Sequence, residues 1–400
     1  MLKSEIAEVI DLQRQGVGAN LGLIRDVLPT LPSVKGFATI ISGVRRCGKS
    51  TLLQQWASAS GMKIVSVLFD DLRLMSFTSQ DFVLLGKIIQ ECHAEGVILD
   101  EVQDIEGWEL FVNGLLLQGL QVLVTGSNAK MLSRELGTKL TGRHLDVHLN
   151  PFSFSEFLRY QQMERTSESL EAYLQMGGFP AYLANGNKQI LAELFNDIIY
   201  RDIVVRYHIP NATPIKQLAA YLLAHIGTRL SPSRLKDVIH VQSAKTVLEY
   251  FDHLVECCLI SRLEQFAPSA KARLLAQKKV YACDVALVAL FEHGKTVNAG
   301  HKLENIVFWH LKKQAKDLTY YCDSNQYECD FVVEQENGEY SLVQVCYELT
   351  ENNREREFRG LASAANYFGL KQGIIVTNSQ RDEAVYEGCE ITIIPAFDYL

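Results

Sequence analysis

The 400-residue sequence lacks the features that mark several large classes of proteins. Its nine cysteines include no C-x-x-C pair, so neither a disulfide framework nor a zinc knuckle is indicated, and a reducing cytoplasmic location is expected. It has no apolar run of about 18 residues, the length that a membrane-spanning helix needs, so no membrane contact is expected. The N-terminus shows no apolar signal-peptide run, and we find no internal repeat or low-complexity segment.

The sequence also lacks an excess of positive charge. It has 39 lysines and arginines against 47 aspartates and glutamates, a formal net charge of −8. Because proteins that coat nucleic acid are usually basic, any contact with DNA must come from a local cluster of cations. With 48% hydrophobic residues the chain can bury large cores, and at roughly 150 residues per domain its length predicts two or three domains.

Short apolar segments alternate with helical segments in the first part of the chain. The apolar segments span residues 37–42, 63–71, 96–104, 121–128 and 144–152. This alternation predicts an α/β domain with a parallel sheet covered on both faces. Ligands of such sheets bind beyond the carboxyl ends of the strands, where the polar motifs of this sequence fall.

The loop after the first strand reads GVRRCGKST and has the complete spacing G-x-x-x-x-G-K-[ST] of a phosphate-binding P-loop. Its backbone N–H groups and the following helix N-terminus are expected to hold phosphate. Lys49 should reach the β- and γ-phosphates, and the Ser50 hydroxyl should bind Mg²⁺. The predicted nucleotide contacts are Gly43, Val44, Arg45, Arg46, Cys47, Gly48, Lys49, Ser50 and Thr51.

Two acidic residues, Asp100 and Glu101, end the apolar segment VILDE. Asp100 is predicted to hold Mg²⁺ through water, and Glu101 to orient or deprotonate the attacking water, as in ATPases that use a carboxylate. The alternative is a solvated strand end. Ser127 and Asn128 end the fourth strand and are predicted to sense the γ-phosphate, although Asn128 could instead cap the next helix.

Arg143 precedes the fifth strand. In oligomeric ATPases an arginine at this place reaches the γ-phosphate of a neighbouring subunit and stabilises the charge of the transition state. We therefore expect a homo-oligomer, with an arginine paired inside its own subunit as the alternative.

Five segments occur in a characteristic order: GVRRCGKSTLL, LDEVQ, LVTGSNAKMLS, LTGRHLDVHLNPFSFSEF and GGFPAYL. In this combination the sequence resembles the AAA+-type ATP-binding proteins of bacteria and archaea, whose ATPase domain is followed by a conserved region of unknown function. The resemblance continues through residues 200–209, 279–291 and 303–311 and covers nearly the whole chain. It implies a P-loop NTPase fold of the AAA+ type, ATP and Mg²⁺, but it supplies no substrate.

We expect four domains. They are a P-loop AAA+-like ATPase domain with N-terminal helices (1–155), a helical lid or connector (156–225), a winged-helix domain (226–290) and a restriction-endonuclease-like α/β domain (291–400).

The winged-helix prediction rests on the order helix, turn, helix, strand over residues 230–266. The second helix spans 243–257, and the segment 267–280 is expected to form the wing. The candidate contacts to nucleic acid are Lys245, Lys271, Arg273, Lys278 and Lys279. Acidic residues on the second helix oppose this interpretation, and the alternative is a winged helix used for protein contacts.

The C-terminal segment resembles the restriction-endonuclease-like fold, with Glu304 on a helix and Asp330 after a hairpin. The strand that should carry an E-x-K motif has Gln344 and Cys346 at these positions. An amide is a poor Mg²⁺ ligand and a thiol cannot replace an ammonium group, so nuclease activity is not expected. Glu304 and Asp330 should then pair with protein groups.

Two functions are consistent with these motifs. One is an oligomeric, Mg²⁺-dependent ATPase that couples ATP turnover to DNA binding or remodelling. The other is an ATP-dependent regulatory or defence switch whose C-terminal modules bind protein partners. The sequence does not decide between them, because fold alone does not determine function.

Overall fold

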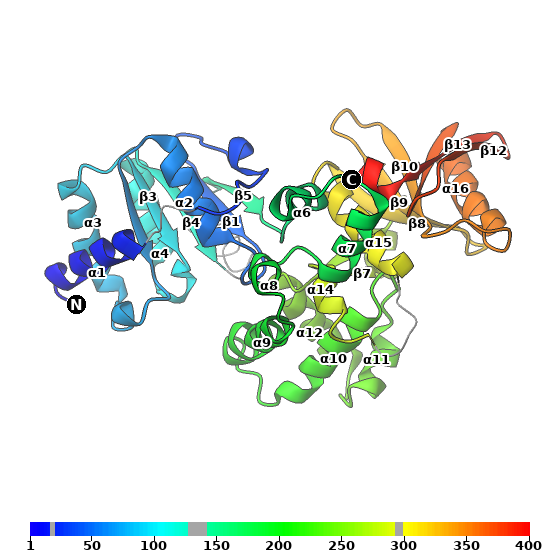
Figure 1. Ribbon diagram of the computed structural model, residues 1–400. Coiled ribbons are helices and arrows are strands. Elements are labelled where there is room, and N and C mark those ends of the chain that lie inside the picture. The colour runs from blue at the N-terminus through cyan, green and yellow to red at the C-terminus, as the bar shows by residue number, and fades with distance from the viewer. Residues whose placement is uncertain (17–20, 127–141, 293–298) are drawn as a thin grey trace. The chain divides into compact units, whose positions relative to one another are not determined.

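Two compact units make up the chain, each with its own β-sheet. The computed structural model describes residues 1–16, 21–126, 142–292 and 299–400. The first unit comprises Met1–Pro151 with Glu256–Cys258, and the second comprises Phe152–Val255 with Leu259–Leu400 (Figure 1). No helix in the described ranges is long and apolar enough to cross a membrane.

The sheet of the first unit is parallel, as the sequence predicts. The strands are β1 (Ala38–Ser42), β2 (Ile64–Leu68), β3 (Gly96–Asp100), β4 (Gln121–Gly126) and β5 (His144–His148). Their order is β2-β3-β4-β1-β5, and every paired strand runs in the same direction as its neighbour. Strand β4 therefore separates β1, which leads into the glycine-rich loop, from β3, which ends in the acidic pair.

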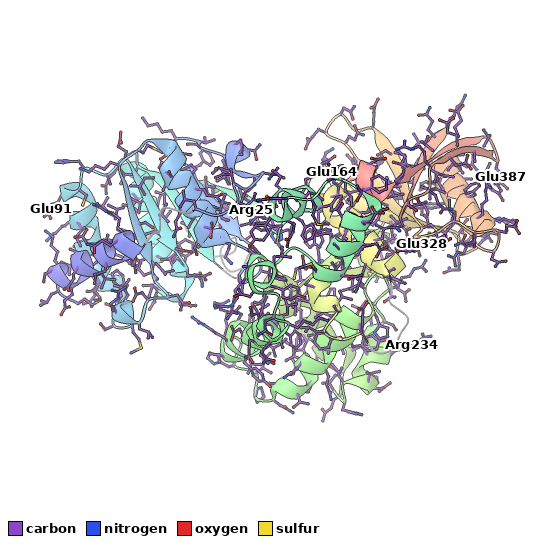
Figure 2. The ribbon with its side chains drawn as sticks, in the orientation of Figure 1. Arg25, Glu91, Glu164, Arg234, Glu328 and Glu387 are labelled. Carbon is purple, nitrogen blue, oxygen red and sulfur yellow. The ribbon has the colours of Figure 1, made fainter. Side chains whose placement is uncertain are left out.

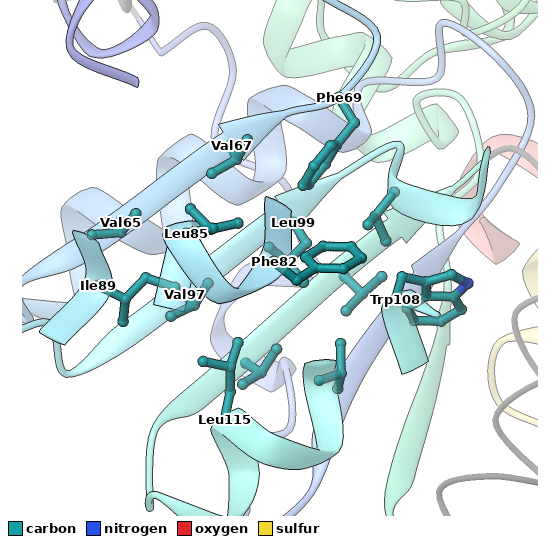
Figure 3. Close-up of a cluster of buried hydrophobic side chains, with 14 of the residues drawn as sticks. Val65, Val67, Phe69, Phe82, Leu85, Ile89, Val97, Leu99, Trp108 and Leu115 are labelled. Atoms are coloured by element: carbon teal, nitrogen blue, oxygen red, sulfur yellow. The ribbon is translucent and has the colours of Figure 1, made fainter. Parts of the chain in front are cut away.

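Helices cover this sheet and close its core. They are α1 (Lys3–Gly16), α2 (Lys49–Ser60), α3 (Phe82–Glu91) and α4 (Trp108–Leu117), with 3₁₀ segments η1 (Leu28–Thr30), η2 (Leu72–Leu74), η3 (Ser79–Asp81) and η4 (Val102–Asp104). Figure 3 shows a buried cluster in which Leu85 of α3 and Leu115 of α4 lie with Val67 of β2 and Val97 of β3. Because such interiors are close-packed, the sheet fixes the positions of its strand ends.

The second unit begins with a series of helices. They are α6 (Phe154–Gln161), α7 (Ser167–Met176), α8 (Pro180–Asn185), α9 (Gln189–Asp197), the π-helix η5 (Ile198–Val205), α10 (Ala212–Ala224), α11 (Pro232–Val238) and α12 (Ala244–Glu256). Two glycines separate α7 from α8. A Cβ atom at Gly178 would lie 2.1 Å from the carbonyl oxygen of Phe152, and one at Gly177 would lie 2.0 Å from Asp284 Oδ1. No larger residue fits this turn.

A mixed sheet forms the rest of the second unit. Within the described residues its strand order is β12-β13-β11-β10-β9-β8-β6-β7. The strands are β6 (Ile260–Gln265), β7 (Lys279–Ala282), β8 (Asp317–Cys322), β9 (Glu328–Glu334), β10 (Tyr340–Val345), β11 (Gln372–Thr377), β12 (Asp382–Tyr386) and β13 (Cys389–Pro395). The helices are α13 (Ala270–Leu275), α14 (Val285–Val288), α15 (Ala299–Lys312), α16 (Arg354–Phe368) and α17 (Ala396–Tyr399). Strand β6 pairs with both β7 and β8, so the strands after α12 share one sheet with the C-terminal strands.

The segment predicted as a wing differs from the expectation. Helices α11 and α12 and strand β6 follow one another as predicted, but residues 267–280 contain the helix α13 and lead directly into β7. The cause is local: the side chain of Ser269 accepts a hydrogen bond from the N–H of Ala272, and the run AKARLL consists of good helix formers. Lys279, expected on the wing, is instead the first residue of β7.

Candidate functional site

The glycine-rich loop joins β1 to α2 in a conformation that requires glycine at two positions. A Cβ atom at Gly43 would lie 2.2 Å from the carbonyl oxygen of Leu149, and Gly48 precedes α2 with a φ of +102°. Residues with side chains rarely adopt such a φ. The N-terminal turn of α2 leaves N–H groups without partners inside the helix, and such groups bind anions.

Lys49 lies inside this loop. It is 5% exposed, and its Nζ donates to the carbonyl oxygens of Gly43 and Val44 at 3.0 and 3.3 Å. The same Nζ lies 3.8 Å from Glu101 Oε1. A buried ammonium between the loop and the end of β3 is well placed to contact an anionic oxygen held by the loop.

Asp100 is the last residue of β3 and is buried. The Thr125 hydroxyl of β4 donates a hydrogen bond to Asp100 Oδ1, and Ser50 of α2 hydrogen-bonds to the same carboxyl group. Burial raises the pKa of Asp100 above its ordinary value, while these two hydrogen bonds act in the opposite direction. The fold thus brings together the two oxygen ligands that the sequence assigned to Mg²⁺.

Glu101 follows in a strained backbone conformation, with a φ of +55°. Its N–H donates to Thr125 Oγ1 at 3.2 Å, and its Oε2 accepts from the side-chain amide of Gln103 at 2.9 Å. Gln103 is buried, and its own Oε1 has no hydrogen-bond partner among the residues that the structure describes. Thr125 and Gln103 therefore orient the acidic pair, and sequence reasoning assigned a role to neither.

Arg25 is a second group that sequence reasoning missed (Figure 2). It is 4% exposed. Its Nη1 donates to the carbonyl oxygen of Cys47 at 3.0 Å, and its Nη2 to that of Asn150 at 2.7 Å. Because charged hydrogen bonds of this kind are strong, Arg25 ties the glycine-rich loop to the segment after β5.

The other predicted nucleotide contacts belong to the same loop. Val44 and Cys47 are buried, Arg46 is exposed with a φ of +64°, Arg45 is partly exposed, and Thr51 lies in the first turn of α2. The predicted sensors Ser127 and Asn128 lie outside the described residues.

Arg143 is exposed and directly precedes β5. In the sheet register His144 pairs with Ala38, the first residue of β1, whereas the glycine-rich loop follows Ser42 at the other end of that strand. At about 3.3 Å per residue, the four steps from Ala38 to Ser42 place these ends about 13 Å apart. Arg143 therefore lies at the opposite edge of the sheet from the loop of its own subunit.

Three of the five cations predicted to contact nucleic acid are buried or only partly exposed, and all three pair with carboxylates. Lys279 is 2% exposed and enclosed by acidic side chains, so it has no accessible charge for a phosphate, and the structure corrects the prediction for this residue. Arg273 pairs with Glu264 at 2.6 Å and with Asp317 at 2.7 Å. Lys278 lies 3.7 Å from Glu264.

The remaining two cations are exposed. Lys245 lies on α12, 3.5 Å from Glu249, and Lys271 lies on α13. Across the predicted set, therefore, few positive charges are available to an incoming phosphate backbone.

Glu304, Asp330, Gln344 and Cys346 line one pocket of about 590 Å³ in the second unit. Gln344 Oε1 accepts from the N–H of Asp330 at 3.0 Å, and its Nε2 donates to Glu357 at 2.7 Å. Burial raises the pKa of Cys346 to about 12, so this thiol is neutral. In the part of the chain that the structure describes, no group of three or more His, Cys, Asp or Glu side chains is arranged to hold a metal ion.

Three family models match successive parts of the chain. A model described as an AAA domain matches residues 35–158, which include the glycine-rich loop and the acidic pair. Two models described as domains of unknown function, DUF8612 and DUF4143, match residues 167–295 and 299–399.

Two relatives, one from an archaeon and one from a bacterium, match most of the chain. The uncharacterized protein MJ1544 of Methanocaldococcus jannaschii is 31% identical over 349 residues, which cover 81% of this chain and 78% of the relative. An uncharacterized protein of Haemophilus influenzae is 28% identical over 383 residues, covering 90% of this chain and 93% of the relative.

Solved structures show only distant similarity. Cdc6p from Pyrobaculum aerophilum is 11% identical with a TM-score of 0.27, and the match covers 68% of this chain and 88% of that one. PCH-2 from C. elegans is 16% identical with a TM-score of 0.22, covering 43% of this chain and 46% of that one. Similarity at this level supports no functional conclusion.

Proposed function

Because the chain belongs to a family of archaeal and bacterial proteins in which an AAA domain precedes two domains of unknown function, we propose that it is an ATPase. The reaction is hydrolysis of ATP with Mg²⁺ at the loop between β1 and α2. The AAA domain supports nucleotide binding, and the arrangement of side chains around the loop supports hydrolysis.

One observation carries this proposal: the buried Lys49 of the glycine-rich loop and the two carboxylates at the end of β3, Asp100 and Glu101, meet at one edge of the sheet. Nζ of Lys49 lies 3.8 Å from Glu101, and Asp100 hydrogen-bonds to Ser50 in the first turn of α2. In open α/β sheets, ligands bind beyond the carboxyl ends of the strands, where the loop after β1 and the acidic pair after β3 both lie. A solvated strand end does not explain a buried Asp100 held by two hydroxyl groups.

Ser50 and Asp100 fit a magnesium ion, because hydroxyl and carboxylate oxygens are the ligands that this cation prefers. Ser50 is exposed at the helix N-terminus, while Thr125 fixes the orientation of Asp100. When bound, Mg²⁺ would neutralise part of the negative charge of the phosphates.

Glu101 is the base in this proposal. Its Oε2 is occupied by the amide of Gln103, whereas its Oε1 faces Lys49 and the loop. A carboxylate oxygen that faces the bound phosphates can orient a water molecule and accept its proton. Lys49 holds the phosphates in place for that attack.

Phosphate release from ATP by the purified protein tests this proposal. Lys49→Ala should remove nearly all turnover, because no other described ammonium lies inside the loop. Lys63→Ala is the matched control, since Lys63 is an exposed lysine of the same unit, just before β2. Equal turnover in the wild type and Lys49→Ala would exclude this site as the source of the activity.

The ion pairs in the second unit favour the second of the two functions, an ATP-dependent regulatory switch, over an ATPase that acts on DNA. Four of the five cations predicted to contact DNA lie within ion-pair distance of a carboxylate, and Lys279 is buried as well. A surface that neutralises its own cations attracts phosphates weakly. We therefore propose that the C-terminal domains bind a protein partner. DNA binding or remodelling is the alternative.

A gel shift with duplex DNA distinguishes a regulatory switch from an ATPase that binds DNA. It is measured with and without nucleotide over a series of salt concentrations, with Lys271→Ala as the test variant. No shift at low salt would support the switch. A shift that is lost steeply as salt rises, and that weakens in Lys271→Ala, would support the ATPase that binds DNA, because several phosphate contacts give that salt dependence.

A further inference from the structure

The ammonium group of Lys279 is enclosed by three carboxylates that line the pocket of the second unit. Its Nζ lies 2.9 Å from Glu304 Oε1 of α15, 2.7 Å from Glu328 Oε1 of β9 and 2.8 Å from Asp330 Oδ1 of β9. Lys279 is 2% exposed. One of its three carboxylate partners, Glu328, is labelled in Figure 2. A buried charge is tolerated only when it is paired and hydrogen-bonded.

These contacts use the full bonding capacity of the ammonium group. A lysine has three N–H donors, and the three carboxylates account for all of them. Burial by itself would lower the pKa of Lys279, but the charges of Asp330 and Glu304 hold that pKa well above its ordinary value. The group is therefore held as a cation, with its three donors engaged by the three carboxylates.

Each carboxylate is also held by a second partner from a different part of the fold. Glu304 Oε1 accepts from the Tyr281 hydroxyl at 2.7 Å, Glu328 pairs with Arg229, and Asp330 Oδ2 accepts from the N–H of Val345 at 3.0 Å. The carboxylates are thus fixed around one point rather than free to turn away from it. With the ammonium in place these carboxylates are not arranged to hold a metal ion. Their three oxygens around a common point are nevertheless the kind of donors that a hard divalent cation selects.

We propose that this pocket is a cation site whose cation belongs to the chain itself: the Lys279 ammonium stands where a divalent metal ion would otherwise bind between Glu304, Glu328 and Asp330. This inference concerns the second unit and is independent of ATP hydrolysis. It has two consequences. The wild-type pocket binds no divalent metal ion, and removal of the ammonium exposes a carboxylate site that does.

The test compares the wild type with Lys279→Met, which keeps the apolar stem and removes the charge. Titration calorimetry with Mn²⁺ is done without nucleotide and well above neutral pH, because burial raises the pKa of Glu304 and the variant lacks the Lys279 charge that lowers this pKa. Lys279→Met should bind Mn²⁺ at least about tenfold more tightly than the wild type, and Mn²⁺ should raise its unfolding temperature. Lys278→Met is the matched control and should behave as the wild type.

A triple variant, Lys279→Met with Glu304→Gln and Asp330→Asn, keeps the inference testable if Lys279→Met does not fold by itself. With two carboxylates neutralised, the triple variant should fold without metal and show no response to Mn²⁺. An unfolded Lys279→Met should then recover its structure when refolded with Mn²⁺.

Three outcomes would overturn the inference. The first is Mn²⁺ binding to the wild type as tight as to Lys279→Met. The second is a Lys279→Met protein that folds without metal and ignores Mn²⁺. The third is a triple variant as unstable as Lys279→Met, because the lysine would then be needed for packing rather than as the balancing charge.

Discussion

Gln103 donates its side-chain amide to Glu101 Oε2 across 2.9 Å, so a buried neutral residue orients the carboxylate that we propose as the base. Gln103→Leu should lower kcat for ATP by roughly tenfold to a hundredfold, because a small misplacement of a reacting group has an effect of this size. The KM for ATP should change little. Gln103→Glu places a second negative charge beside Glu101 and should shift the acidic limb of the pH–rate profile upward.

The effects on kcat, KM and stability show whether Gln103 positions Glu101 or only supports the fold. Gln118→Leu changes an exposed glutamine at the end of α4 and serves as the control. If Gln103→Leu raised KM and lowered stability while its kcat stayed at the wild-type value, Gln103 would be a structural residue only.

Glu101→Gln should separate binding from turnover. The amide keeps the shape of the side chain and loses the ability to accept a proton, so ATP affinity should persist while hydrolysis falls by roughly a hundredfold to ten-thousandfold. Fluorescent-nucleotide binding and phosphate release measure the two quantities on one preparation. Glu106→Gln, an exposed neighbour, should be normal in both. Wild-type turnover in Glu101→Gln would refute the assignment of the base.

The parallel sheet and the P-loop could be predicted because their signals are local. Apolar runs mark the strands, and the spacing from Gly43 to Ser50 identifies the loop without any knowledge of the fold. Arg25 carries no such signal. Its partners Cys47 and Asn150 lie 22 and 125 positions away, so only the folded chain brings the three together.

Lys279 illustrates the same limit. In the sequence it is one of several cations between residues 267 and 280, and nothing there distinguishes a buried lysine from an exposed one. Its role depends on β7, α15 and β9 meeting at one place, and these elements are separated by long stretches of chain. The pairing of Glu304 and Asp330 with a protein group was predicted from their chemistry, whereas the identity of that group was not.

Arg143→Ala should reduce turnover without weakening ATP binding, because Arg143 lies at the far edge of the sheet from the loop of its own subunit. We expect a loss of roughly a thousandfold, the usual effect of an arginine that stabilises transferred phosphate. A mixture of Arg143→Ala and Lys49→Ala proteins should recover part of the activity, since each subunit supplies what its neighbour lacks. Phosphate release from the mixture measures this recovery.

The control mixture combines Arg143→Ala with the double variant Lys49→Ala/Arg143→Ala, which has no arginine to supply and should give no recovery. Absence of recovery in the first mixture, together with a monomeric mass by light scattering in ATP, would exclude a role of Arg143 toward a neighbouring subunit.

Asp284 should make the stability of the second unit depend on pH. Its carboxylate accepts hydrogen bonds from the N–H groups of Gly178 and Ala286, yet burial raises its pKa from 3.8 to about 7. Because the folded protein favours the protonated acid, this contribution to the free energy of unfolding is complete below the unfolded pKa. It is lost as the pH rises toward about 7, by up to roughly 4 kcal/mol.

Denaturant unfolding of the wild type and Asp284→Asn at a series of pH values isolates this contribution. The amide does not titrate, so its curve should be flatter by the amount that Asp284 contributes, although Glu304 adds a dependence of the same sign to both proteins. Asp237→Asn, an exposed carboxylate of the same unit, should reproduce the wild-type curve. If the wild type and Asp284→Asn gave parallel curves between pH 3.8 and about 7, Asp284 would be ionised in the folded protein, and its two backbone hydrogen bonds would outweigh its burial.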